Sequence, residues 1–328
     1  MGQRQWALTR SPKQGHLTME VSIQPSPTAF SRNRRIARRR IRWSAQIPAY
    51  LFLLPALLVF GVFAWYPIVK TVLFSFQNVD LHGESTWIGL DNFQRMIADP
   101  SFLIAWRNSF LFAFLSIGIG FWVPIIVAIM VNEMRRAKAF FRLVHFLPTV
   151  IPITISIIIW RMLYSPDNGF LNALLALFRI PPQAWLQDAR LVRPSMIVLL
   201  TWANFGSTLL IYLAALQDIP AEYYEAAEIA GANPLQRVVY ITLPQLYRTM
   251  VITFVLQIIA VVQIFTEPFL LTQGGPGTET LTPVLVVYRT AFLSNDFGLA
   301  SAWSLSLVIV LSIFSIIYLR ISRSVANY

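Results

Sequence analysis

The stretch NSFLFAFLSIGIGFWVPIIVAIMVN, residues 108–132, contains no Asp, Glu, Lys or Arg. As an α-helix it would be about 37 Å long, more than the roughly 30 Å hydrocarbon thickness of a bilayer. Other charge-free runs of at least 18 residues occupy positions 43–69, 143–160, 194–217, 249–266 and 297–319. Six such runs predict an all-α membrane protein with six transmembrane helices.

The prolines inside these runs include Pro55, Pro124, Pro148 and Pro152. They are compatible with membrane helices because neighbouring helices can satisfy the backbone groups that proline leaves free. We expect each of them to kink its helix without ending it.

The composition supports membrane insertion and argues against nucleic-acid binding. Of 328 residues, 56% are hydrophobic and 12% are charged, whereas soluble domains usually carry about 25% charged residues. The net charge of +11 would by itself suggest a nucleic-acid-binding protein. Ten of the 26 Lys and Arg, however, precede residue 43, and seven of these lie in SRNRRIARRRIR, residues 31–42. We therefore expect membrane lipids, and no nucleic acid, as partners.

The basic residues also predict the orientation of the chain. Residues 1–42, 133–142, 218–248 and 320–328 together hold 18 Lys and Arg, and the intervening segments hold 8. By the positive-inside rule, the first set and both termini are cytoplasmic. The predicted organisation is a basic, partly disordered cytoplasmic tail over 1–46, a six-helix domain over 47–322 and a cytoplasmic end over 323–328.

No catalytic residues or metal ligands can be proposed. Cysteine is absent, and His16, His82 and His145 are far apart without metal-ligand spacing. A phosphate-binding loop requires Gly-x-x-x-x-Gly-Lys-Ser/Thr, and none of the three lysines follows a glycine. We predict that the chain is not an enzyme.

Residues 218–245 are predicted to form two short cytoplasmic helices. Asp218 is expected to cap the first, and Gly231 to end it in a left-handed conformation. Asn233 is expected to cap the second, which the pair Leu243-Pro244 would end before the next span. Because the first helix exposes small and apolar side chains, it is a plausible docking element; the alternative is a connector lying along the headgroups, although such connectors are usually basic.

This segment also resembles a known motif. The pattern matches the EAA motif of permease subunits of binding-protein-dependent ABC importers at Glu225, Ala226, Ala227, Gly231, Ile241, Leu243 and Pro244. Further stretches are similar to the sugar-type permeases of maltose and glycerol-phosphate importers: WIGLDNF (87–93), Arg107-Asn108, Trp160-Arg161, Gly169, Asn172, IYLAALQDIP (211–220) and LTQGGPG (271–277). Ala230 departs from the pattern, because these permeases commonly carry Asp before the glycine.

The resemblance implies the transmembrane domain of a type I ABC importer in the inner membrane of a bacterium. The first EAA helix would couple it to cytoplasmic subunits that bind ATP and Mg²⁺, so that this chain needs no cofactor. Glu225 would supply a charged contact, Ala226 and Ala227 the close-packed face, and Gly231 the turn. A second homologous permease would complete the pore, and an extracytoplasmic solute-binding protein would meet the outer segments 70–107 and 272–298.

A few polar residues near or within the spans are candidates for contact with a transported solute. They are Asn204, Ser207, Thr208, Gln257, Gln263 and Glu267. The alternative for the uncharged ones is hydrogen bonding between helices, worth about 0.6 kcal/mol each on average. Arg161 and Glu267 border the outer side, where headgroup-level placement is the alternative to solute contact, and for Arg161 we favour placement at the headgroups.

We expect an importer of a carbohydrate or sugar-like compound. A peptide or polyamine importer is the nearest alternative. A secondary transporter is less favoured, because inverted repeats and intramembrane ionisable residues are not evident. A membrane-embedded enzyme would need a cluster of acids, histidines or metal ligands that the sequence does not contain.

Overall fold

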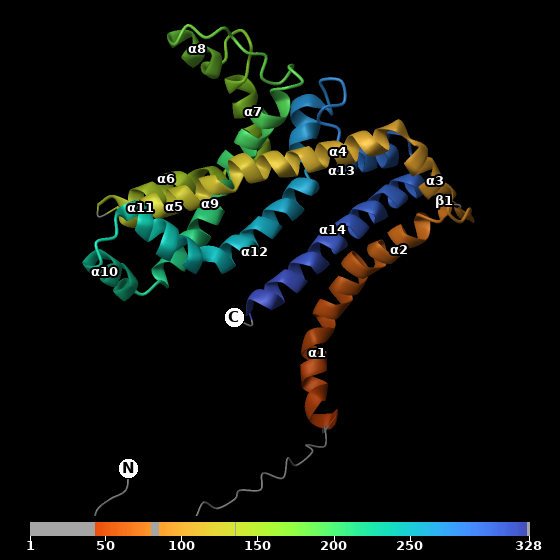
Figure 1. Cartoon of the computed structure of the whole chain (residues 1–328). Coiled ribbons are helices and arrows are strands. Elements are labelled where there is room, and N and C mark those ends of the chain that lie inside the picture. Colours follow the sequence, from red (N-terminus) through yellow and green to blue (C-terminus); the bar gives the residue numbers. More distant parts are fainter. Residues whose placement is uncertain (1–42, 80–84, 135, 327–328) are drawn as a thin grey trace, which may run out of the picture. The chain divides into compact units, whose positions relative to one another are not determined.

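The computed structural model describes residues 43–79, 85–134 and 136–326 (Figure 1). Most of the predicted basic tail, residues 1–42, and the last part of the predicted cytoplasmic end, residues 327–328, lie outside the described residues. Contacts divide the chain into two units, 1–57 and 58–328. The described part of the first unit is the start of helix α1.

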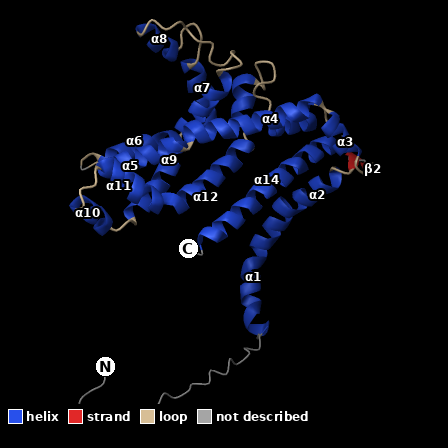
Figure 2. Ribbon diagram, in the orientation of Figure 1, coloured by secondary structure: helices blue, strands red, loops and turns tan. Residues whose placement is uncertain are grey.

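Helices dominate the described residues (Figure 2). The first seven are α1 (Trp43–Phe60), α2 (Tyr66–Phe74), α3 (Asp91–Ala98), α4 (Pro100–Leu115), α5 (Trp122–Glu133), α6 (Lys138–Val150) and α7 (Ile153–Leu163). The others are α8 (Phe170–Leu177), α9 (Val192–Gln217), α10 (Ala221–Ile229), α11 (Pro234–Arg237), α12 (Leu243–Val262), α13 (Pro283–Tyr288) and α14 (Phe297–Ala326). The π-helical turns are η1 (Gly61–Trp65), η2 (Ser116–Gly120), η3 (Val238–Thr242), η4 (Pro268–Thr272) and η5 (Arg289–Leu293). One small antiparallel hairpin pairs β1 (Gln77–Val79) with β2 (Ser85–Trp87), placing Gln77 opposite Trp87.

Five continuous helices are long and apolar enough to cross a membrane. They are Tyr50–Phe74, Pro100–Glu133, Val192–Gln217, Pro234–Val262 and Phe297–Arg320. Because a π-helical turn keeps the chain helical, η1, η2 and η3 each join two shorter helices into one span. These helices overlap five of the six predicted runs, and the predicted all-α membrane fold is confirmed apart from the small hairpin. The predicted orientation remains a prediction.

The sixth predicted span, residues 143–160, is not straight. Helices α6 and α7 meet at an angle of 99°. The break occurs at Ile151 and Pro152, whose backbones are both extended. A residue before proline avoids the α conformation, and proline donates no hydrogen bond. The prediction that Pro152 only kinks its helix was therefore wrong, whereas Pro148 lies inside α6.

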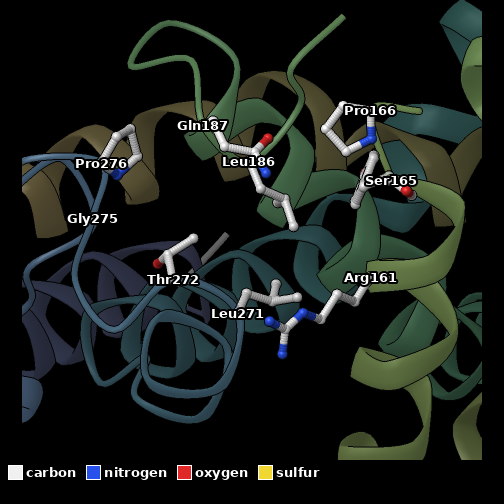
Figure 3. A pocket seen from close by; sticks show the side chains of 10 residues that line it. Arg161, Ser165, Pro166, Leu186, Gln187, Leu271, Thr272, Gly275 and Pro276 are labelled. Carbon is white, nitrogen blue, oxygen red and sulfur yellow. The ribbon is translucent and has the colours of Figure 1, made fainter. Parts of the chain in front are cut away.

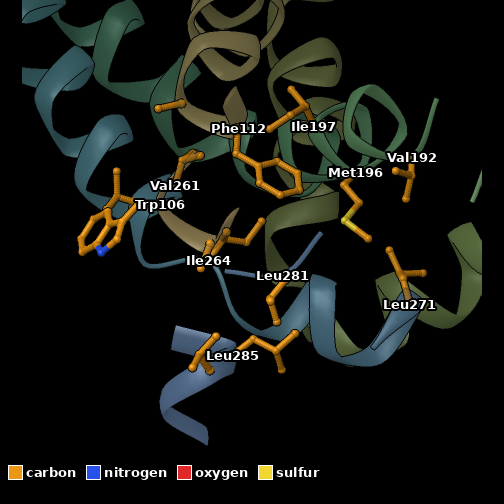
Figure 4. Close-up of a cluster of buried hydrophobic side chains, with 14 of the residues drawn as sticks. Trp106, Phe112, Val192, Met196, Ile197, Val261, Ile264, Leu271, Leu281 and Leu285 are labelled. Atoms are coloured by element: carbon orange, nitrogen blue, oxygen red, sulfur yellow. The ribbon is translucent and has the colours of Figure 1, made fainter. Parts of the chain in front are cut away.

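An apolar core joins α4, α9, α12, α13 and α14 within the second unit. Phe112, Met196, Ile197 and Leu285 are almost fully buried in it (Figure 4). Trp303 of the same core is also fully buried. The faces that point away from this core also carry large apolar side chains. Helices that are apolar on all sides fit a bundle surrounded by lipid.

Hydrogen bonds of Arg193 and Asn108 fix the predicted outer ends of α4 and α9. Arg193 forms an ion pair with Glu279 and donates from Nη2 to Asn108 Oδ1 at 3.0 Å. The Asn108 amide nitrogen donates to the carbonyl oxygens of Thr278 at 2.7 Å and Leu281 at 2.9 Å. These contacts attach the loop after η4 to two spans, and that loop lines one of the two hollows described next.

Candidate functional site

A polar cavity of about 440 Å³ lies between α9, α12 and the turn η2. It is lined by all six residues predicted to contact the solute. Asn204, Ser207 and Thr208 come from α9, Gln257 from α12, Gln263 follows α12, and Glu267 precedes η4. The structure thus brings together side chains up to 63 positions apart, from 204 to 267, although their contact with solute remains a prediction.

Some of these groups also bond the protein itself. The Gln257 amide nitrogen donates to Ser116 Oγ at 2.6 Å and to the Ser116 carbonyl oxygen at 3.0 Å, joining α12 to η2. Asn204 donates to the Leu200 carbonyl oxygen and Ser207 to the Asn204 carbonyl oxygen, both within α9. Helix bonding, the alternative role considered from the sequence, is therefore present for Gln257.

Other polar groups remain available to a ligand. Among the described residues, the side chains of Thr208 and Gln263 have no hydrogen-bond partner in the protein, and both line the cavity. Asn204 and Ser207 keep acceptor oxygens after donating within their helix. A ligand rich in hydroxyl groups would find both donors and acceptors on this wall.

Ser116 and Gly120 are cavity residues that sequence reasoning missed. Both lie in the π-helical turn η2, inside the apolar run 108–132. A Cβ atom on Gly120 would lie 2.8 Å from Thr201 Oγ1 and 3.0 Å from Gln257 Nε2. A larger residue here would displace the ends of the Thr201 and Gln257 side chains. The sequence signal was the pair of small residues Gly118 and Gly120 next to a serine, in an otherwise bulky run.

Among the described residues that line the cavity, Glu267 is the only ionisable one. It is 6% exposed, and burial raises the pKa of its carboxyl above the ordinary value. The hydrogen bond it accepts from its own backbone amide opposes this shift of the pKa. Glu267 is therefore a buried residue of the cavity wall.

A second hollow of about 400 Å³ lies on the predicted outer side (Figure 3). Arg161 lines it opposite Leu271 and Thr272 of η4. Tyr164 also lines it, and its hydroxyl donates to the Ser195 carbonyl oxygen at 2.8 Å. Arg161 lines this hollow and is not among the residues that line the polar cavity.

The predicted coupling segment forms helix α10 followed by α11. Pro220 is the N-cap of α10, whereas Asp218 ends α9, so the predicted capping by Asp218 was wrong. Proline suits the start of a helix because it has no N–H to leave unsatisfied. On α10, Glu225 and Ala226 are exposed and Ala227 is half-buried.

Gly231 ends α10 in the predicted left-handed conformation, with φ +79°. Its N–H donates to the Glu228 carbonyl oxygen at 3.0 Å, and the Ala232 N–H donates to the Ala227 carbonyl oxygen at 2.9 Å. This pair of bonds is a Schellman motif, in which glycine is the preferred residue. The predicted cap at Asn233 is also confirmed, as part of a capping box with Gln236.

The prediction that Leu243-Pro244 ends the second helix was wrong. Residues Pro234–Val262 form one helix, and the turn η3 lies just before Pro244. In η3 the Leu243 N–H bonds the carbonyl oxygen of Val238, five residues earlier. This wider turn lets the helix continue past a proline. The EAA residues Ile241, Leu243 and Pro244 therefore belong to the start of a span.

One contact ties α10 to that span. The hydroxyls of Tyr224 and Thr242 are hydrogen-bonded at 3.0 Å, and Thr242 is buried in η3. The only other polar contact that links α10 to the segment 234–242, among the described residues, is a 3.8 Å approach of Glu228 to Arg237. The Tyr224–Thr242 bond is thus the shorter of the two polar contacts between α10 and the helix Pro234–Val262, part of which lines the cavity.

Comparison with known proteins identifies the family. Residues 120–327 match the family "Binding-protein-dependent transport system inner membrane component". A probable ABC transporter permease of Bacillus subtilis, YurN, is 34% identical over 284 residues, 85% of this chain and 97% of that protein. The arabinooligosaccharides transport system permease protein AraP of the same organism is 31% identical, covering 92% of this chain and 96% of its own.

A solved structure has the same fold. It is a chain of a bacterial ABC transporter involved in the import of the acidic polysaccharide alginate, with a TM-score of 0.77. The two chains are 24% identical, and the match covers 86% of this chain and 96% of the other. The chain therefore belongs to the permease subunits of binding-protein-dependent ABC transporters, as a non-catalytic, multi-pass protein of the inner membrane that binds no cofactor.

Proposed function

We propose that this permease carries a carbohydrate or sugar-like solute, and that the solute passes through the polar cavity. The observation that carries the proposal is the cavity lining, in which amide and hydroxyl side chains predominate among the polar groups. Phe205 and Phe265 add aromatic surface to the same wall. Hydroxyl-rich solutes need many donors and acceptors, and sugar rings also pack against apolar faces. The name of the relative AraP, an arabinooligosaccharide permease, supports the same class of solute.

Helix α10 is proposed to contact a cytoplasmic subunit that binds and hydrolyses ATP. Its exposed face carries Glu225 and Ala226, and Ile229 at its end is 90% exposed. An apolar side chain so exposed next to small residues favours close contact with another protein. Movement of α10 would reach the cavity through Tyr224, Thr242 and the continuous helix Pro234–Val262.

Two further partners belong to the proposal. A second, homologous permease would supply the opposite wall of the pathway. An extracytoplasmic solute-binding protein would deliver the solute to the outer segments, and a solved structure of the alginate transporter in complex with a pentasaccharide-bound periplasmic protein supports such an arrangement.

The solute class is tested with the binding protein that works with this permease. The purified binding protein is screened for thermal stabilisation against carbohydrates, peptides and polyamines. Stabilisation by a carbohydrate is expected; stabilisation by a peptide or a polyamine alone would overturn the sugar assignment.

The coupling role is tested in the complete importer in proteoliposomes. Gly231→Asp is expected to leave the chain in the membrane while abolishing uptake and solute-stimulated ATP hydrolysis. ATP hydrolysis is also expected to require the separate ATP-binding subunit. Uptake that is driven by an ion gradient in the absence of that subunit would instead indicate a secondary transporter. Normal transport by the variant would contradict the assignment of α10.

A further inference from the structure

The charge of the cavity wall has a single source. Of the described residues that line the cavity, none is Lys, Arg or His, and Glu267 is the one that can ionise. The wall is otherwise built from uncharged polar and apolar side chains. Any charge that a solute meets on this wall is therefore negative.

Three basic side chains of the predicted outer segments, Arg161, Arg193 and Arg289, have other contacts or line another hollow. Arg193 pairs with Glu279 and bonds Asn108, and Arg289 donates to the Gln273 carbonyl oxygen. Arg161 lines the outer hollow. Within the described part of the chain, Glu267 has no ion-pair partner, and it is 6% exposed. An unpaired carboxylate in such surroundings favours hydroxyl donors or cations and disfavours other anions.

We infer that the cavity selects solutes by charge. It admits uncharged, hydroxyl-bearing solutes, whose hydroxyl groups donate hydrogen bonds to Glu267, and it disfavours solutes that carry a carboxylate or a phosphate. This inference rests on the proposed function, because it assumes that the solute passes this wall. It adds a filter that acts after the solute has left its binding protein.

The size of the effect follows from the shape of the site. A cleft whose charges have one sign and whose walls are apolar changes the local concentration of ions by about 10- to 1,000-fold. One partly screened carboxylate belongs at the low end of that range. We expect a discrimination of about tenfold between cationic and anionic probes of equal size.

The chain contains no cysteine, so one introduced thiol can report this charge without knowledge of the solute. Ser207→Cys places the thiol on the wall, and the variant is studied in the complete importer in membranes at pH 8. Labelling rates are measured with a cationic trimethylammonium and an anionic sulfonate methanethiosulfonate, by mass spectrometry of this chain. Each rate is divided by the rate of the same reagent with a small thiol in solution.

The normalised cation-to-anion ratio is expected to be about tenfold. Adding Glu267→Gln should bring it close to one. The control is Asp167→Asn, which removes the same charge from an exposed loop outside both cavities and should leave the ratio unchanged. If Ser207→Cys fails to assemble, Thr208→Cys offers a second position on the same wall.

The possible failures are distinguishable. Labelling at equal normalised rates, or a ratio that Glu267→Gln leaves unchanged, would overturn the charge filter and leave the proposed pathway intact. Absence of labelling by either reagent, with and without ATP, would show that water does not reach the cavity, and would overturn the pathway together with the filter.

Discussion

Replacing Gly231 by alanine is expected to weaken coupling without unfolding the permease. At φ +79° an L-residue brings its Cβ close to its own backbone, at a cost of about 1–2 kcal/mol. Nothing lies within 4 Å of the position that a Cβ would occupy. The cost is therefore purely conformational and falls on the Schellman turn that ends α10.

The conformational cost at position 231 predicts how strongly each variant loses coupling. A loss of 1–2 kcal/mol lowers the ratio of turned to unturned α10 ends by about 5- to 30-fold. Asparagine adopts the left-handed conformation more readily than alanine. Solute uptake and solute-stimulated ATP hydrolysis in proteoliposomes should therefore decrease in the order Gly231, Gly231→Asn, Gly231→Ala.

Gly89→Ala is a matched control. Gly89 has φ +62° and also has nothing within 4 Å of its missing Cβ, but it lies between β2 and α3. It should show a similar loss of thermal stability with near-normal coupling. Equal effects of the two alanine variants on coupling, or a Gly231→Ala variant with wild-type uptake, would refute the argument.

Three other perturbations test the contacts around the cavity. Tyr224→Phe removes the 3.0 Å bond to Thr242, worth about 1 kcal/mol, and should lower solute moved per ATP hydrolysed with little change in melting temperature; an unchanged ratio would show that the bond does not transmit movement. Gly206→Ala places a Cβ 2.4 Å from the His145 carbonyl oxygen of α6 and should destabilise the detergent-solubilised chain by about 1–3 kcal/mol. Gly118→Ala is the control, because a Cβ at this position has no atom within 4 Å. Equal melting temperatures of the two variants would contradict the close packing of α6 on α9. Because burial raises the pKa of Glu267, the folded chain holds this proton more tightly than the unfolded chain does. The carboxyl therefore lowers stability increasingly as pH rises from the unfolded value of about 4.3 through the folded pKa. Glu267→Gln should therefore gain melting temperature over the wild type at pH 8 and lose that advantage near pH 4.5, whereas a difference independent of pH would refute the assignment.

Local signals in the sequence were accurate where neighbours along the chain decide the outcome. Gly231 and Asn233 were predicted correctly, because a left-handed turn and a capping box involve residues only a few positions apart. The five long spans follow from uninterrupted apolar runs. The prediction at Asp218 failed because Pro220, two residues later, is the better start for a helix.

Two predictions about prolines were wrong: one proline breaks a helix that was expected to continue, and the other lies in a helix that was expected to end. Pro152 was expected to leave a helix intact, yet the chain turns by 99° there, since α6 and α7 pack separately along α9. Pro244 was expected to end a helix, yet the π-helical turn before it lets the helix continue. A proline alone does not specify which outcome occurs, because the preceding backbone is a π-helical turn before Pro244 and extended before Pro152.

The sequence by itself determined that this is a helical membrane protein, which family its coupling segment belongs to, and which polar residues are costly enough in lipid to need a role. Hydropathy and local turn chemistry require no knowledge of distant contacts. Only the tertiary structure decided that Asn204, Gln257 and Glu267 share one wall, that Ser116 and Gly120 complete it, and that Tyr224 reaches Thr242. These pairings depend on which faces of distant helices pack together, and helices that are apolar on every side carry no periodic pattern that reveals those faces.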